Sequence, residues 1–283
     1  MPELSIILPT CNRAALLERA ILTITKTVRC DHEIIVVDGA STDSTAQVLD
    51  QAKQQLGSRL RVITESKREG FVRAANKGFR AAVGQNMLWL NDDVRPLPGA
   101  IDSAVAQLNS ESTDVAFLAL YHRWHSARNV AYEISLASQT YRLCHVRGTL
   151  YANFAIGRRK TFEQLDYFDE RFYFYAADPD LSLKAWHAGL RIVPAHACAV
   201  DHDQHEDDRR ETDASAGQAD NEKLFAKWDL PAKSAHNDFN PAKPNTLKGL
   251  LQRSSVNEVS SKPLPPLYSG EGRAKGLRLH FAQ

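Results

Sequence analysis

The sequence lacks the features that define several large classes of protein. No hydrophobic run approaches the roughly 20 residues of a membrane span. We expect no signal peptide, because Pro2 and Glu3 precede a first apolar run that covers only residues 4–8. The four cysteines lie far apart without metal or redox spacing, which predicts reduced thiols in a cytosolic protein. No GxGxxG follows the first predicted strand, and no GxxxxGK precedes Ser or Thr, so the signatures of a Rossmann dinucleotide site and of a P-loop are missing.

Net charge is also small, but it is unevenly distributed. The net charge of +1 does not indicate binding to nucleic acid. Residues 231–283 carry +5, which leaves −4 for residues 1–230, and they contain six of the twelve prolines. We therefore expect one domain with two halves, residues 1–110 and 111–230, followed by a basic tail, residues 231–283. The tail is predicted to be disordered or draped over the body, and it could contact a membrane surface or a partner.

Short apolar segments alternate with amphipathic helical patterns through the first half of the chain. Four strands are predicted at residues 4–8, 33–37, 60–64 and 87–90. Asn12 and Ser41 are suitable N-caps for two of the intervening helices, and a third helix is expected from Gly70. This alternation predicts an α/β fold with a mostly parallel, doubly wound sheet and helices on both faces.

The second half is expected to add further strands and helices. The predicted strands cover residues 115–120, 130–135, 149–156 and 191–200, and the predicted helices cover residues 100–108, 158–165, 178–189 and 213–228.

Two adjacent carboxylates, Asp92 and Asp93, follow the apolar strand at residues 87–90. Ligands of open α/β sheets bind beyond the carboxyl ends of the strands, and neighbouring carboxylates repel each other unless a cation or strong donors offset their charge. The pair could therefore hold Mg²⁺ or Mn²⁺ together with the phosphates of a substrate. The alternative is a simple turn, since Asp-Asp before residues 95–99 is also good turn chemistry.

Other polar residues follow predicted strands or begin predicted helices. Asp38 ends the second strand, where its carboxylate can accept hydrogen bonds from a base or a ribose. Arg68 and Arg73 lie around Gly70 at a predicted helix start, which favours phosphate, although Arg73 could equally lie on a solvated helix face.

In the second half of the chain, Asp178 begins a predicted helix and His202 follows a predicted strand. Asp178, followed by Pro179, is a suitable N-cap, and a cap position can also hold a catalytic carboxylate rigidly. His202 follows the last predicted strand, as Asp93 follows its own strand. Most of the acidic residues around and after His202, from Asp201 to Asp208, favour a solvated loop over a metal cluster.

The order of these segments resembles the inverting glycosyltransferases of family 2, which have the GT-A fold. The resemblance covers residues 4 to about 228 and depends on several motifs in the same order. These motifs are Ser5-Ile6-Ile7-Leu8-Pro9-Thr10-Cys11-Asn12-Arg13, Val36-Val37-Asp38-Gly39-Ala40-Ser41-Thr42-Asp43, residues 70–78 with Arg73 and Asn76, Leu90-Asn91-Asp92-Asp93 with residues 95–99, residues 168–192 with Asp178-Pro179-Asp180-Leu181, and Phe225-Ala226-Lys227-Trp228.

The resemblance implies a metal-dependent, inverting transfer of a sugar from a nucleotide-diphosphate sugar, most commonly a UDP-sugar, to an acceptor hydroxyl. It assigns Asp178 as the general base, and one base without a protein nucleophile implies inversion. It assigns Asp93 and His202 to a Mn²⁺ or Mg²⁺ ion that neutralises the leaving diphosphate. The residues implied to contact the donor are Pro9, Thr10, Asn12, Arg13, Asp38, Arg73, Asn76 and Asp92.

Three positions depart from the family's pattern. Gly39 stands where a second acidic residue is common, which leaves the base of the donor nucleotide open. Asn91 replaces the first acid of the DxD motif, so Asp93 is expected to be the main metal ligand. Ala177 replaces a Glu beside Asp178, and the loss of this like charge predicts that Asp178 ionises more readily.

Three alternative functions follow from the same residues. A sugar nucleotidyltransferase would need a glycine-rich basic loop after the first strand, but residues 9–13 contain no glycine. A non-catalytic nucleotide-sugar-binding module is less consistent with the joint presence of Asp93, Asp178 and His202. A metal hydrolase built on His202 and His205 would lack helical His spacing.

The resemblance also implies a setting for the protein. Polysaccharide or lipid-linked oligosaccharide synthesis would supply a saccharide or lipid-linked saccharide acceptor. The expected location is cytoplasmic, with the inner face of the membrane as one alternative. Aromatic loops at residues 121–125 and 172–175 suit stacking on sugar faces, with packing in the core or at the rim as the alternative.

Overall fold

Four parallel strands form one half of the sheet, as the alternation of strands and helices predicted. The structure, a computed structural model, describes residues 1–123, 130–146, 149–203 and 208–228. The strand order in this half is β3-β2-β1-β4. The bounds are β1 Leu4–Thr10, β2 His32–Asp38, β3 Leu60–Thr64 and β4 Asn86–Trp89, connected by α1 Ala14–Thr27, α2 Thr45–Leu56 with the short turn η1 Gly57–Arg59, and α3 Phe71–Ala81.

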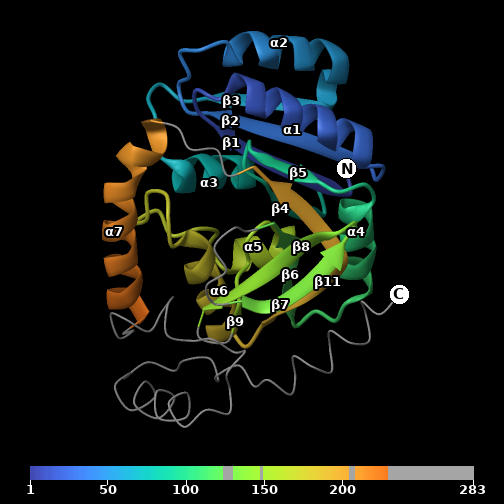
Figure 1. Cartoon of the computed structure of the whole chain (residues 1–283), viewed down its shortest axis with the longest axis vertical. Coiled ribbons are helices and arrows are strands. Elements are labelled where there is room, and N and C mark those ends of the chain that lie inside the picture. The colour runs from blue at the N-terminus through green and yellow to red at the C-terminus, as the bar shows by residue number, and fades with distance from the viewer. Residues whose placement is uncertain (124–129, 147–148, 204–207, 229–283) are drawn as a thin grey trace.

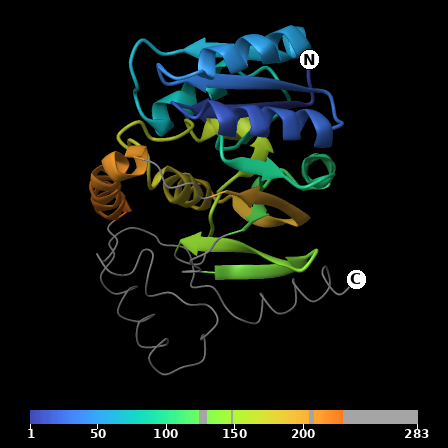
Figure 2. The same cartoon turned by 45° about the horizontal axis from the view of Figure 1, so that its top comes forward.

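Helices cover both faces of these strands (Figure 1), and the layers separate clearly in the turned view (Figure 2). Successive residues of a strand point to opposite faces. Ile6 accordingly packs with Leu17 of α1 and Leu49 of α2, whereas Ile7 packs with Phe79 of α3. Both faces are therefore apolar, which explains why β1 and β2 are buried along their whole length.

The second half of the sheet mixes strand directions. β10 lies antiparallel between β4 and β6, β11 is parallel to β6, and β5 is antiparallel to β11. The parallel order is thus confined to β3-β2-β1-β4 and to the β6–β11 pair. The bounds are β5 Val94–Pro96, β6 Val115–His122, β7 Val130–Leu136, β8 Gln139–Val146, β9 Thr149–Leu150, β10 Ala155–Arg158 and β11 Arg191–His202, with α4 Ala100–Ser110, α5 Arg159–Gln164, α6 Ala177–His187 and α7 Asp208–Trp228.

Two predictions for the second half were wrong. Residues 149–156 do not form one strand: β9 pairs with β8 and β10 with β4 and β6, and the chain turns between them at Phe154, which has a positive φ of 46°. Residues 121–125 are not simply a loop, because Tyr121 and His122 complete β6 and are buried. Trp124 and His125 lie outside the described residues.

The predicted helix caps were also wrong. Arg13, not Asn12, precedes α1, and Ser44, not Ser41, precedes α2. Asn12 and Ser41 instead connect the two loops: the Asn12 backbone N–H donates to Ser41 Oγ at 2.8 Å, and Asn12 Oδ1 accepts from the Thr42 backbone N–H at 2.7 Å. Long-range hydrogen bonds between loops thus replace the local capping bonds that the sequence suggested.

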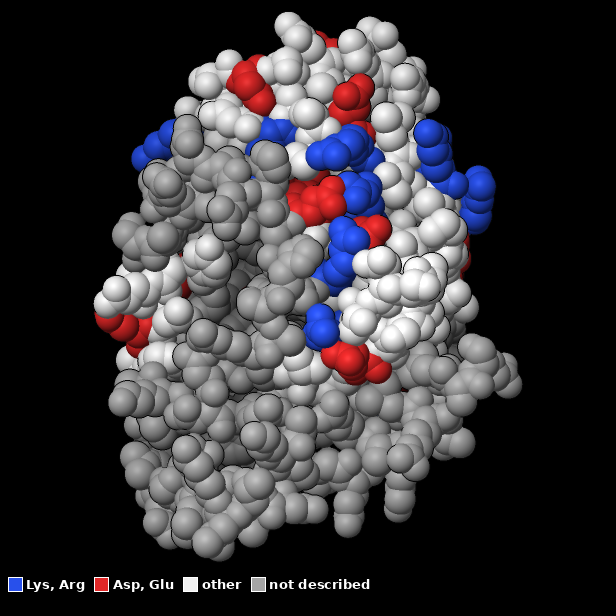
Figure 3. Space-filling model, viewed as in Figure 1, with Lys and Arg blue, Asp and Glu red and all other residues white. Residues whose placement is uncertain are grey.

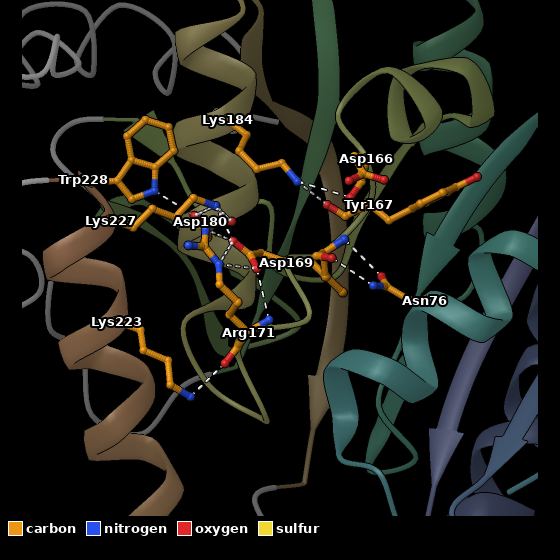
Figure 4. Close-up of polar contacts among 11 residues, drawn as sticks. Asn76, Asp166, Tyr167, Asp169, Arg171, Asp180, Lys184, Lys223, Lys227 and Trp228 are labelled. Atoms are coloured by element: carbon orange, nitrogen blue, oxygen red, sulfur yellow. Dashed lines mark hydrogen bonds and ion pairs between the residues drawn. The ribbon is translucent and has the colours of Figure 1, made fainter.

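α7 closes the domain by packing across α6 and the loop before it (Figure 4). It starts at Asp208, five residues earlier than predicted, and its expected packing residues Leu224 and Trp228 are buried. Lys227 Nζ donates to Asp169 at 2.7 Å and to Asp180 at 2.8 Å, and Trp228 Nε1 donates to Asp180 Oδ1 at 2.7 Å. Within the described ranges, no helix combines the length and apolar character that a membrane crossing requires.

Candidate active site

A cavity of about 330 Å³ opens beyond the carboxyl ends of the parallel strands, where ligands of open α/β sheets bind. Residues from both halves of the sheet line it, so the two predicted halves of the domain meet there. The lining residues are Pro9, Thr10, Cys11, Arg13, Gly39, Glu65, Arg68, Gly70, Phe71, Ala74, Trp89, Asn91, Asp92, Asp93, Asn153, Phe154, Phe174, Tyr175, Asp178 and His202.

Arg13 holds the two adjacent carboxylates of the cavity together. Its Nη1 lies 2.8 Å from Asp92 Oδ1 and 3.0 Å from Asp93 Oδ2, and all three residues are buried. Thr10 Oγ1 donates to Asp92 Oδ2 at 2.8 Å. One guanidinium offsets only one of the two carboxylate charges, so the cluster formally retains a negative charge and still favours a second cation.

His202 lies beside Asp93, although 109 positions separate them in the sequence. The pairing of β11 with β5 places His202 opposite Val94, and the backbone N–H of Asp203 donates to the Asp93 carbonyl at 2.9 Å. His202 Nε2 is 3.4 Å from Asp93 Oδ1. Burial alone would raise the pKa of Asp93, but the proximity of His202 and the Arg13 guanidinium hold its pKa below the usual value. Asp93 is therefore ionised at neutral pH, as a metal ligand must be.

The residues present fit a metal ion that the substrate helps to bind. In the part of the chain that the structure describes, no group of three or more His, Cys, Asp or Glu side chains forms a ready metal site. Asp93 and His202 provide one carboxylate and one imidazole, and Mg²⁺ is commonly held by one or two carboxylates plus substrate phosphates and water. A divalent ion would thus need a diphosphate to complete its coordination.

Two residues expected to contact the donor, Asp38 and Asn12, form hydrogen bonds within loops. Asp38 is buried, and its carboxylate accepts hydrogen bonds from the Ser41 backbone N–H at 3.2 Å and from Ser41 Oγ at 2.5 Å. Asn12 Oδ1 accepts from the Thr42 backbone N–H at 2.7 Å. Neither residue is among the cavity lining, whereas Gly39 is. Asp38 and Asn12 therefore shape the loops at this end of the cavity.

Arg73 and Asn76 do not line the cavity. Asn76 is fully buried, and its side chain donates to the Phe168 carbonyl at 2.9 Å and accepts from the Phe168 N–H at 3.0 Å. This amide ties Phe168 to α3, whereas the resemblance implied a contact of Asn76 with the donor. Arg73 lies on the partly exposed face of α3, 4.0 Å from Glu170, which matches the solvated-face alternative.

Glu65 and Arg68 line the cavity in the loop between β3 and α3. Glu65 was not identified from the sequence, although it directly follows a predicted strand, as Asp38 and Asp93 follow theirs. Its carboxylate accepts from Lys77 Nζ at 2.7 Å and from the Glu69 backbone N–H at 3.1 Å. The Arg68 guanidinium lies 5.9 Å from the centre of the Tyr173 ring. Of the two arginines considered around Gly70, it is Arg68 that faces the cavity.

Asp178 is the second residue of α6 rather than its N-cap, so the cap prediction was wrong. Ala176 precedes the helix in a left-handed conformation with φ 65°. Burial raises the pKa of Asp178 to about 6. This effect opposes the expectation that Asp178 ionises more readily, because burial of the charged form outweighs the missing like charge at Ala177. No ion pair involves Asp178 among the described residues.

Aromatic side chains form the wall near Asp178. Phe174 and Tyr175 come from the loop before α6, and Phe154 comes from the turn between β9 and β10. The Phe154 ring forms T-shaped contacts with both His122 and His202, with centroid distances of 5.5 and 5.2 Å. Burial lowers the pKa of His122 to about 3, with the nearby His202 as a further cause. The imidazole beside the Phe154 ring is therefore neutral at pH 7. Of the predicted aromatic loop 172–175, Phe172 is a core residue and Tyr175 is 39% exposed.

The acidic residues beside His202 pair with arginines. Arg95 forms a two-pronged ion pair with Asp203, and Arg123 lies 3.8 Å from Asp201. Basic and acidic side chains alternate over the described part of the face in Figure 3. Asp201 and Asp203 thus have arginine partners of their own, in agreement with the solvated loop favoured by the sequence. His205, which the hydrolase alternative required, lies outside the described residues.

Comparisons with known proteins identify the family of the chain. The model of "Glycosyl transferase family 2" matches residues 5–166. The chain is 34% identical over 109 residues to GalNAc(5)-diNAcBac-PP-undecaprenol beta-1,3-glucosyltransferase of Campylobacter jejuni, covering 38% of this chain and 35% of that protein. It is 37% identical over 92 residues to a PGL/p-HBAD biosynthesis glycosyltransferase of Mycobacterium bovis, covering 32% and 36%. The matched region thus spans about a third of the length of these curated relatives.

Two solved structures share the fold. The TarS 1-349 structure from S. aureus in complex with UDP-GlcNAc has a TM-score of 0.60 at 21% identity, covering 74% of this chain and 61% of that one. The mannosyltransferase PcManGT from Pyrobaculum calidifontis, in complex with GDP-Man and Mn²⁺, has a TM-score of 0.59 at 19% identity, covering 80% and 64%. The fold is GT-A, and the chain belongs to glycosyl transferase family 2.

Proposed function

We propose that the protein is a metal-dependent, inverting glycosyltransferase that moves a sugar from a nucleotide-diphosphate sugar to an acceptor hydroxyl. The observation that carries the proposal is that Asp93 and His202 line the same cavity as Asp178. A site for the leaving diphosphate and a candidate base thus share one cavity of about 330 Å³. Membership of the family removes the support for a sugar nucleotidyltransferase.

The donor side of the site is assigned to residues 1–110 together with His202. Asp93 and His202 would hold Mn²⁺ or Mg²⁺, which when bound neutralises the charge that develops on the leaving diphosphate. Arg13 keeps the two carboxylates in place, and Thr10 orients Asp92 through its hydroxyl. Arg68 also lines the cavity and is a second basic side chain that could contact a donor phosphate. UDP is the nucleotide we expect first, and UDP-GlcNAc is bound by one structural neighbour.

The acceptor side is assigned to residues 111–230, with Asp178 as the general base. A base works best when its pKa lies near the working pH, and burial raises the pKa of Asp178 to about 6. The other cavity carboxylates have cationic neighbours: Asp92 and Asp93 contact Arg13, and Glu65 contacts Lys77. Asp178 is therefore the carboxylate best placed to take the proton of an acceptor hydroxyl. A single base without a protein nucleophile gives inversion at the anomeric carbon.

The acceptor we propose is a saccharide or a lipid-linked saccharide. One relative is named for transfer to an undecaprenol-linked glycan. The aromatic wall of Phe174 and Tyr175 suits the apolar face of a sugar ring. Work on a lipid-linked acceptor would place the protein in the cytoplasm at the inner face of the membrane.

A donor panel tests the proposal directly. Purified protein is incubated with UDP-, GDP- and dTDP-sugars, with Mn²⁺ or with EDTA, and release of the nucleotide diphosphate is measured. We expect slow release from at least one donor in Mn²⁺ and none in EDTA. Mn²⁺-dependent binding without turnover, even when saccharide acceptors are supplied, would instead support a non-catalytic nucleotide-sugar-binding module. Turnover in EDTA would exclude the metal-dependent mechanism.

A further inference from the structure

The loop that carries Phe174 and Tyr175 is held by a carboxylate from another element. Asp220 of α7 is fully buried. Its Oδ2 accepts the backbone N–H groups of Tyr173 at 3.1 Å, Phe174 at 2.8 Å and Tyr175 at 2.9 Å, and its Oδ1 lies 3.1 Å from Tyr173 N and from Lys223 Nζ. Three consecutive N–H groups that converge on one anion form a backbone nest.

This arrangement is energetically demanding and geometrically specific. A buried carboxylate is tolerated only when it is well hydrogen-bonded, and hydrogen bonds to a charged acceptor are roughly twice as strong as neutral ones. Without Asp220, three neighbouring N–H groups would lose their acceptor. The carboxylate therefore fixes the backbone of three residues at once, which a hydrophobic contact could not do.

α3 and α7 both contact this loop. The Val72 backbone N–H, in the first turn of α3, donates to the Tyr173 carbonyl at 3.3 Å. A Cβ at Gly70 would lie 2.7 Å from the Tyr173 ring, and one at Gly217 of α7 would lie 2.8 Å from the Tyr175 ring. Both glycines thus permit a close approach that any side chain would prevent.

The loop leads directly into the candidate base. Tyr175 is followed by Ala176, which precedes α6 with a left-handed φ of 65°, and Asp178 comes two residues after Ala176. An alanine in this conformation is strained and persists only where the surroundings impose it. The hydrogen bonds to Asp220 end at the residue just before this turn, so they are placed to impose it.

We propose that Asp220 is a positioning residue for the acceptor side of the active site. It holds residues 173–175 in the nest, which sets the Tyr175 ring in the cavity wall and the direction in which α6 presents Asp178. Asp220 does not line the cavity, so it acts through the loop and not on a substrate. The functional part of this inference depends on the proposed glycosyltransferase activity.

The main test replaces the carboxylate with an amide in the full chain. Asp220→Asn keeps the shape but loses the charge. We expect hydrogen–deuterium exchange at the amides of residues 173–175 to become faster. We expect kcat for the nucleotide sugar found in the donor panel to fall roughly tenfold or more, since small displacements of catalytic groups can cost up to about 10²-fold. The Kd of UDP or GDP with Mn²⁺ and the donor KM should not change.

Two further variants separate positioning from general destabilisation. Glu222→Gln makes the same chemical change at an exposed position on the same helix and should leave exchange and kcat unchanged. Gly217→Ala improves helix propensity but pushes a methyl group against Tyr175. Gly217→Ala should lower kcat without lowering the melting temperature. It therefore tests the position of the loop even if Asp220→Asn does not fold.

Each outcome has a distinct meaning. Unchanged exchange and kcat in Asp220→Asn, with an active wild type, would overturn the positioning role and leave the proposed function intact. A fall in kcat matched by an equal loss of nucleotide affinity would also overturn it, because a general loss of structure explains that pattern. A wild type that turns over no nucleotide sugar would overturn the proposed function, and the exchange measurement would then decide only whether Asp220 holds the loop.

Discussion

Individual charged residues in the cavity have surroundings that set their ionisation in opposite directions. Asp93 lies beside His202 and Arg13, which hold its pKa below the usual value despite burial. Asp178 has no ion pair in the described part of the chain, and burial raises its pKa to about 6. Two carboxylates with separated pKa values suit two different tasks, one as a permanent anion and the other as a proton acceptor.

The first prediction concerns the metal. Asp93→Ala should abolish transfer and remove the Mn²⁺-dependent binding of a nucleotide diphosphate, because it deletes the carboxylate beside His202. Asp92→Ala should reduce transfer and Mn²⁺-dependent binding by less, since Asp92 already accepts hydrogen bonds from Arg13 and Thr10. Isothermal titration calorimetry with UDP or GDP, with and without Mn²⁺, measures this. Unchanged metal-dependent binding in Asp93→Ala would show that the metal assignment is wrong.

The second prediction concerns the base. Asp178→Asn should reduce kcat by roughly 10²–10⁴-fold, the usual contribution of a general base, with donor binding intact. In the wild type, kcat should rise with pH through about 6, because only the ionised carboxylate accepts a proton. Steady-state kinetics from pH 5 to pH 8 measure both effects. Normal turnover by Asp178→Asn would mean that the base lies elsewhere.

Asp178→Asn should also be more stable than the wild type above about pH 6. The folded-state pKa of Asp178 is raised to about 6, above the value of about 3.9 for an unfolded chain, so ionisation favours unfolding. This cost grows between about pH 4 and pH 6 and is then constant. Asp178→Asn removes it, so the melting temperature should exceed that of the wild type at pH 8 but not at pH 4. An equal difference in melting temperature at pH 4 and pH 8 would show that ionisation of Asp178 is not the cause.

At the scale of elements, α7 is attached by a small set of buried polar contacts (Figure 4). Asp180 in α6 is fully buried, and its partners Lys227 and Trp228 both come from the last turn of α7. The packing of α7 on α6 thus depends on specific hydrogen bonds as well as on Leu224 and the Trp228 ring.

The third prediction tests this attachment. Trp228→Phe keeps an aromatic ring but removes the indole N–H that donates to Asp180, so it should lower the free energy of unfolding by about 1–3 kcal/mol. Urea denaturation followed by circular dichroism measures the change. Phe225→Leu, at a partly buried position of the same helix, serves as a control for apolar packing. A negligible effect of Trp228→Phe would mean that solvent or Lys227 replaces the lost bond.

At the scale of the whole molecule, the described structure ends with α7. The described contacts of α7 end at Trp228, and residues 231–283 carry a charge of +5. Their structure lies outside the described residues, so the role of the tail stays a prediction from its sequence.

The fourth prediction is that a chain truncated after Leu230 still folds. It should keep a cooperative thermal transition, because the network that attaches α7 remains complete. Its binding to vesicles that contain anionic lipid should be weaker than that of the full chain, since about 1 kcal/mol is expected for each basic residue near such a surface. Loss of the cooperative transition would place the tail in the core, and equal vesicle binding would exclude a membrane role for it.

Local sequence patterns were sufficient for the first half of the fold. β1 to β4 and their helices follow from apolar segments that alternate with amphipathic ones, since burial on both faces needs continuous apolar strands. The second half was harder to predict, because antiparallel insertions such as β10 depend on which distant strand offers a free edge. The helix start expected at Gly70 is confirmed. The N-caps predicted at Asn12 and Ser41 were wrong, because these residues form hydrogen bonds between their two loops.

The sequence by itself determined the family, the parallel half of the sheet and the chemical types at the carboxyl ends of the strands, because these depend on residues close together in the chain. Only the tertiary structure decided which of those residues share a cavity. It brought His202 to Asp93, added Glu65, and placed Arg73 and Asn76 elsewhere. It also decided the ionisation of Asp178 and the hold of Asp220 on its loop, because burial and contacts across 40 or more positions are properties of the folded chain.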